Sequence, residues 1–104
     1  MIFVETSVFT CQLKELLTDE EYSALQRFLI AKPLAGDVIK GSGGLRKVRW
    51  TLAGQGKRGG VRVIYYFVDE AEQFRMLLIY RKGVQDDLTS AQLRVLRTIK
   101  DRWS

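Results

Sequence analysis

Apolar side chains recur along this chain with two different periods. Between residues 6 and 32, and again from 89 to 103, they stand three and four residues apart, which aligns them on one face of an α-helix. Residues 1–4, 43–50, 59–66 and 74–80 alternate apolar with polar side chains or run continuously apolar, as strands do. We therefore predict the order β-α-α-β-β-β-α, a single α+β domain over residues 1–104 whose helices cover one face of a sheet.

Polar side chains and a proline mark the ends of the predicted helices. Thr18 with Glu21, and Thr89 with Gln92, have the spacing of a capping box, in which each side chain accepts a hydrogen bond from the other residue's backbone N–H. Pro33, the only proline, ends the second helix. The first two helices therefore meet with almost no loop, as an antiparallel helix pair does.

Three of the predicted strands follow one another through short connections. A glycine-rich turn separates residues 43–50 from 59–66, and an acidic turn leads on to 74–80. This arrangement predicts a three-stranded antiparallel meander. Val38 and Ile39 lie in the glycine-containing connection before the meander, and we expect them to tuck under the sheet and anchor that connection.

The charge balance favours an acidic partner. Lys and Arg total 17 against 12 acidic residues, which gives a net charge of +5 and a pI near 9.6. Such a balance is typical of domains that bind nucleic acid or another acidic surface. The apolar runs are too short to span a bilayer and the chain opens without a signal-peptide pattern, so we predict a cytoplasmic protein without membrane contact.

Two residue types with specialised chemistry are almost missing. The chain has no histidine and one cysteine, Cys11, which excludes an intramolecular disulfide and essentially excludes a zinc site. The absence of histidine also removes Ser-His and Cys-His catalysis. Cys11 falls within a helical pattern, where we expect a small buried thiol. We expect neither a metal nor a cofactor.

Cations gather in the predicted hairpin. Alternation puts Lys47 and Arg49 on one face of their strand, and the core residues Val48 and Trp50 on the other. Like charges held close together repel one another, so their gathering favours a polyanionic partner, with RNA as the leading candidate. The hairpin set comprises Arg46, Lys47, Arg49, Lys57, Arg58 and Arg62.

A further group of functional side chains ends the next strand. Tyr80 ends the predicted strand 74–80 and Arg81 and Lys82 follow it, whereas Arg62 stands at the start of the preceding strand. Because the two strands run antiparallel, that end and that start lie side by side. We therefore expect one cationic rim on the sheet.

Such a rim can cleave RNA without metal or histidine. The ribose 2′-OH attacks the adjacent phosphorus, and guanidinium groups stabilise the charge that builds on the non-bridging oxygens. Lys47 is a candidate base, although a phosphate contact is its simpler role. Tyr80 can donate a proton or stack on a base.

Two other charged features have ordinary interpretations. Asp86 and Asp87 precede the last helix, where carboxylates complement the helix dipole, so we assign them to the helix rather than to catalysis. The basic face of that helix, which carries Arg94 and Arg97, is typical of a solvated surface.

Residues 36–39, 41–50 and 56–66 carry a family resemblance, and residues 78–82 and 86–89 also fit it. In these segments the chain resembles the RelE/HigB toxins of bacterial type II toxin–antitoxin systems, most closely the HigB2-like branch. The resemblance implies a compact, microbial-RNase-like α+β fold. It further implies a metal-independent endoribonuclease that cleaves mRNA in the ribosomal A site and halts translation.

The resemblance also implies residue roles and partners. Lys47 and Arg49 match the basic pair of the family's second strand, and Arg62 matches the arginine that contacts the scissile phosphate. Lys82, or Arg81, takes the later basic position. The implied partners are the ribosome, mRNA and a cognate antitoxin, commonly a HigA-like helix-turn-helix protein that masks the toxin.

One position departs from that pattern. RelE carries a catalytic tyrosine shortly after its last basic residue, whereas residues 83–88 contain none here and Tyr80 precedes the basic pair. Two other functions stay open beside the nuclease. One is a ParE-like poison of DNA gyrase with the same fold, and the other is a non-catalytic nucleic-acid-binding module.

Overall fold

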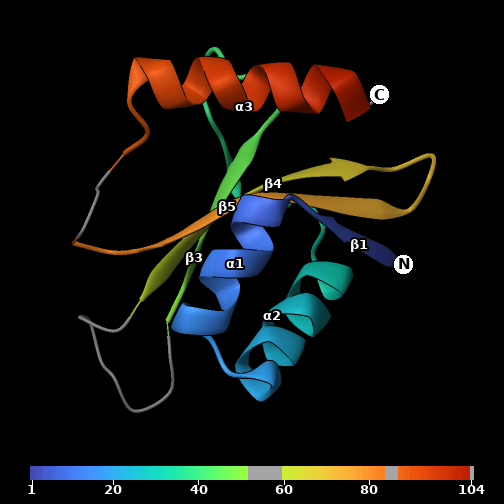
Figure 1. Cartoon of the computed structure of the whole chain (residues 1–104). Helices are drawn as coiled ribbons and strands as arrows, with labels where there is room; N and C mark the ends of the chain where they lie inside the picture. Colours follow the sequence, from blue (N-terminus) through green and yellow to red (C-terminus); the bar gives the residue numbers. More distant parts are fainter. Residues whose placement is uncertain (52–59, 84–86, 104) are drawn as a thin grey trace.

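One mixed sheet runs through the molecule, with helices on both of its faces (Figure 1). The computed structural model describes residues 1–51, 60–83 and 87–103. Within these ranges the elements are, in chain order, β1 (Ile2–Glu5), α1 (Ser7–Leu16), α2 (Asp19–Ala31), β2 (Asp37–Val38), β3 (Arg46–Trp50), β4 (Val61–Val68), β5 (Gln73–Arg81) and α3 (Ser90–Trp103). The predicted α+β order is confirmed, and the short strand β2 is added to it.

The sheet has the strand order β1-β5-β4-β3-β2. Strands β3, β4 and β5 form the predicted antiparallel meander, in which Arg62 pairs with Arg49 on one side and with Tyr80 on the other. Strand β1 instead pairs parallel with β5, from Ile2 opposite Gln73 onward. The sheet is therefore mixed rather than purely antiparallel, because the first strand joins the far edge of the meander.

The predicted capping boxes are both present. Thr18 Oγ1 accepts a hydrogen bond from Glu21 N–H at 3.1 Å, and the Glu21 carboxylate accepts one from Thr18 N–H at 2.8 Å. Thr89 and Gln92 exchange the same two bonds at 3.1 and 3.0 Å. The second box fixes the start of α3, the helix that lies nearest the candidate site described below.

Each face of the sheet has its own core. On one face α1 and α2 bury Phe9, Leu25 and Leu29 against the sheet. On the other face α3 buries Leu96 in a smaller core that includes Ile64 (Figure 1). The prediction that all helices cover one face is therefore wrong. An apolar stripe shows that a helix is buried, but it does not say against which face.

Two local expectations are corrected in part. Val38 pairs with Arg46 in β2 and is 57% exposed, so it does not tuck under the sheet. Its neighbour Ile39 does pack against the smaller core, as expected. Cys11 is exposed on α1 rather than buried.

Among the described residues, no helix combines the length and apolar character that crossing a membrane requires.

Candidate functional site

Strands β3 and β4 place three cations on the face of the sheet that α3 partly covers. Arg49 lies directly opposite Arg62, and Lys47 lies opposite Ile64, which belongs to the core beneath α3. Direct cross-strand partners project from the same face, so the three cations share that face. We call Lys47, Arg49 and Arg62 the cationic cluster. Arg49 is exposed, whereas Lys47 and Arg62 are partly buried.

The carboxylate of Asp87 lies against this cluster. Its Oδ1 accepts a hydrogen bond from Lys47 Nζ at 2.7 Å, which makes the two an ion pair. That hydrogen bond, together with the positive charges of Lys47, Arg49 and Arg62, holds the pKa of the Asp87 carboxyl below its usual value of 3.8. One carboxylate therefore senses all three cations.

Asp87 is the residue that sequence reasoning missed. The assignment of Asp87 to the start of the last helix overlooked its ion pair with Lys47, a residue 40 positions away in the chain. No spacing rule links two such distant positions, and only the fold brings them together. Asp86 lies outside the described residues.

The ion pair of Asp87 with Lys47 leaves two arginines of the cationic cluster without an ion pair of their own among the described residues. Arg49 and Arg62 are like charges at directly opposed positions, an arrangement that destabilises a sheet. Within the described residues neither arginine forms an ion pair. Guanidinium groups that form no ion pair within the described residues, on a partly open face, are suited to bind a phosphate.

A hollow of about 230 Å³ adjoins the cluster. Lys47 and Asp87 line one part of it, and Lys40 adds a further cation from the connection between β2 and β3. Lys40 could not be predicted from the sequence, because an isolated lysine in a connection carries no pattern. We call this space the cluster hollow.

Tyr80 and Arg81, which end β5, and Lys82, which follows it, do not share one environment. Tyr80 pairs with Arg62, but it is only 7% exposed and its hydroxyl oxygen is buried. Arg81 pairs with Val61, whose side chain belongs to the core beneath α1 and α2, so Arg81 lies on that opposite face. Lys82 is exposed, and its backbone N–H donates to the Gly60 carbonyl at 3.0 Å, which holds it beside the start of β4.

The remaining predicted RNA-binding residues do not join the cluster in the described structure. Arg46 projects to the face of α1 and α2, where its Nη1 donates to the carbonyls of Leu34 and Gly36 at 3.3 and 2.8 Å. These bonds fasten the connection after α2 to the sheet. Lys57 and Arg58 lie outside the described residues.

The described residues contain no group of three or more His, Cys, Asp or Glu side chains that could hold a metal ion. The donor set of the candidate site is one carboxylate among cations. Such a set suits an anionic ligand better than a divalent cation.

Comparison with known proteins supports the fold. No protein-family model matches the chain. A mutant of the E. coli toxin RelE in the free state is similar, with a TM-score of 0.59 and 12% sequence identity over 95% of each chain. The isolated E. coli RelE toxin has a TM-score of 0.56 and 13% identity, over 94% of this chain and 97% of that one. At this identity the likeness shows a RelE-like fold, and the HigB2-like branch stays a prediction.

Proposed function

We propose that this protein is the toxin of a type II toxin–antitoxin system and that it cleaves mRNA in the ribosomal A site. Two observations support the proposal together. The chain has the fold of the E. coli RelE toxin. It also places Arg49 directly opposite Arg62, with Lys47 on the same face, and this grouping of cations is the observation that carries the proposal.

The proposed reaction uses the cationic cluster to stabilise charge. The 2′-oxygen of a ribose forms a bond to the adjacent phosphorus, and the bond from phosphorus to the 5′-oxygen of the next nucleotide breaks. Negative charge builds on the non-bridging oxygens, and the guanidinium groups of Arg49 and Arg62 bind them through paired N–H donors. The products are a 2′,3′-cyclic phosphate and a 5′-hydroxyl end.

Asp87 is the proposed acceptor of the 2′-OH proton. It is an ionised carboxylate at the edge of the cluster, and a phosphate that binds the cations competes for Lys47, its hydrogen-bond donor. Lys47 donates to a carboxylate in this structure, so its geometry fits a phosphate contact better than a general base.

Lys82 is the proposed donor of a proton to the leaving 5′-oxygen. In an in-line displacement the attacking and leaving oxygens stand on opposite sides of phosphorus, so the base and the acid must flank it. Strand β4, which carries Arg62, lies between β3 and β5. Asp87 contacts Lys47 of β3, and Lys82 follows β5, so the two flank Arg62.

The proposed partners are the ribosome, its mRNA and a cognate HigA-like antitoxin, and the proposed location is the cytoplasm, where ribosomes translate. A neighbouring reading frame that encodes a short helix-turn-helix protein would support the antitoxin. The chemistry needs no metal, so EDTA-treated protein should keep cleaving when cobalt hexammine replaces Mg²⁺ in holding ribosomes together. Loss of cleavage on intact ribosomes would contradict that expectation.

Primer extension on mRNA from cells that express the protein tests the activity. We expect cuts within translated codons, and we expect Arg62→Ala to abolish both the cuts and growth arrest. Arg27→Ala removes an exposed arginine of α2, on the opposite face, and should change neither. Intact mRNA with DNA damage would instead indicate gyrase poisoning, and tight binding to nucleic acid without growth arrest would indicate a non-catalytic binding module.

A further inference from the structure

Helix α3 carries a charge that its own packing does not explain. Its sequence has four cations and a single carboxylate, Asp101. The four cations differ in their surroundings. Lys100 lies 3.8 Å from the carboxylate of Asp101 and 4.9 Å above the ring of Tyr66, so it already has partners within the fold. Arg94 and Arg97 are exposed, and within the described residues neither forms an ion pair.

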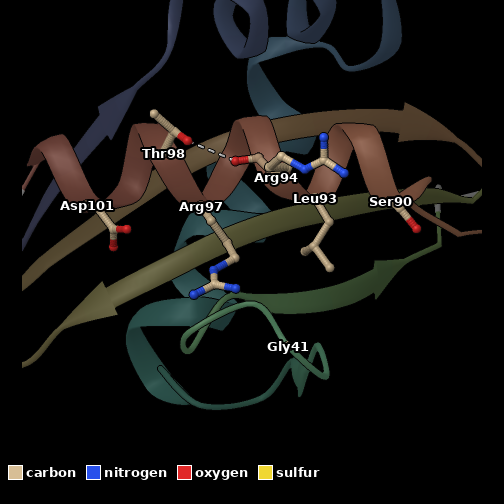
Figure 2. A pocket seen from close by; sticks show the side chains of 7 residues that line it. All are labelled: Gly41, Ser90, Leu93, Arg94, Arg97, Thr98 and Asp101. Carbon is tan, nitrogen blue, oxygen red and sulfur yellow. Dashed lines mark hydrogen bonds between the residues drawn. The ribbon is translucent and has the colours of Figure 1, made fainter.

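Arg94 and Arg97 line a hollow of about 340 Å³ between α3 and the connection that carries Gly41. Figure 2 shows Leu93 and Arg97 pointing from α3 toward that connection. Gly41 has a φ of +74°, a conformation that favours glycine, and open space surrounds the position where a Cβ would stand. The wall opposite the arginines is therefore backbone, which a ligand can approach closely. We call this space the α3 hollow.

The α3 hollow adjoins the cluster hollow. Leu93 lines both spaces, and the second space reaches Lys40, Lys47 and Asp87. A line of cations therefore leads from Arg62 and Arg49 through Lys47 and Lys40 to the arginines of α3. Single-stranded nucleic acid binds to grooves of this kind, in which successive cations follow the phosphate backbone.

We propose that the α3 hollow is a second RNA subsite, in which Arg94 and Arg97 bind the sugar–phosphate backbone of the same strand that is cleaved at the cationic cluster. The proposal rests on the proposed function for its choice of strand. Leu93 offers an apolar contact to a ribose or base between the two groups of cations. The subsite deepens the proposed function, because it makes affinity depend on RNA that lies beyond the cleaved bond.

Binding of fluorescent 2′-O-methyl RNA tests the subsite, because this probe lacks the attacking hydroxyl and is not cleaved. The probes are about four and about twelve nucleotides long, within the range of single-strand site sizes. We expect Arg94→Gln/Arg97→Gln to weaken binding of the long probe on the order of tenfold, and to lower its salt slope by roughly 1.4, since each lost phosphate contact on a single strand accounts for about 0.7. Binding of the short probe should stay unchanged.

The matched control is Lys14→Gln/Arg27→Gln, which removes the same charge from exposed positions on α1 and α2. Thermal unfolding shows whether both variants remain folded. Equal behaviour of the two double variants, or equal losses on both probe lengths, would overturn the proposal. The same variants are tested for binding to polyglutamate and to ribosomes without mRNA. A loss of binding restricted to polyglutamate would assign the surface to an acidic protein and overturn the proposal. A loss of binding restricted to ribosomes without mRNA would also overturn it.

The binding assay does not measure cleavage, so its outcome is separate from that of the proposed function. Absence of ribosome-dependent cuts in the primer-extension experiment would reject the nuclease. It would leave the length dependence of RNA binding, and its sensitivity to Arg94 and Arg97, as an independent result.

Discussion

Arg49 of β3 and Arg62 of β4 face each other directly across the sheet. Their guanidinium groups repel each other, and within the described residues neither has an ion-pair partner. A phosphate bound by both guanidinium groups would offset this repulsion, because each group is attracted to the anion. The pair therefore sets stability of the free protein against its proposed affinity for RNA, and this opposition can be measured.

Replacing one arginine should stabilise the protein while it impairs the reaction. We expect Arg49→Gln to raise the free energy of unfolding by about 0.2–1 kcal/mol, the range for cross-strand pairs, and to slow cleavage by about 100-fold. Denaturant unfolding and single-turnover cleavage measure the two effects. In an Arg62→Gln background the stabilisation should vanish, and its persistence there would mean that the two arginines do not interact.

The ion pair with Lys47 should be visible in the titration of Asp87. Its pKa in the folded protein is lowered, so the stabilising contribution of the pair is complete above about pH 4, near the unfolded-state value. That contribution is lost as the pH falls through the folded value, which lies below 3.8. Carboxyl-carbon NMR should show the pKa of Asp87 rising in Lys47→Ala and staying the same in Lys14→Ala. An unchanged pKa in Lys47→Ala would show that the pair does not form in solution.

Two conservative substitutions separate the candidate proton-transfer residues. Asp87→Asn keeps the side-chain shape but removes the proton acceptor, so cleavage should fall by about 100-fold. Tyr80→Phe removes a hydroxyl whose oxygen is buried, so cleavage should stay within about threefold, well below the loss expected of a general acid. The reverse order of effects, measured at saturating ribosome concentration, would transfer the catalytic role to Tyr80.

Arg46 should matter to folding rather than to RNA. Arg46→Ala leaves the carbonyls of Leu34 and Gly36 without their charged donor, and we expect a loss of about 1–3 kcal/mol in the free energy of unfolding. Cleavage per folded molecule should be unchanged. Denaturant titration together with an activity assay well below the unfolding transition distinguishes this role from direct contact with RNA, which would lower activity without lowering stability.

Local signals in the sequence identified most of the fold. The capping boxes at Thr18 and Thr89 marked helix starts, because such caps depend on side chains only three residues apart. Alternation separated Lys47 and Arg49 from Arg46 for the same reason: the two-residue period of a strand is a local property.

The sequence did not predict how segments far apart in the chain lie relative to one another. The face on which α3 packs, the parallel pairing of β1 and the approach of Asp87 to Lys47 all join residues far apart in the chain. Many arrangements satisfy the same hydrophobic periods, and the choice among them depends on how complete elements pack together. The candidate site was therefore predicted as a set of cations, whereas its carboxylate was not.

The pairing of β1 with β5 has a consequence for when the molecule can take shape during synthesis. Strand β1 leaves the ribosome before β5 and has no edge to join until Gln73 and its neighbours follow. Contacts between such distant segments form late, because the intervening chain has to be gathered first. Strand β1 therefore stays without a partner until β5 has been made, whereas β3 and β4, which carry Arg49 and Arg62, are complete earlier and can pair first.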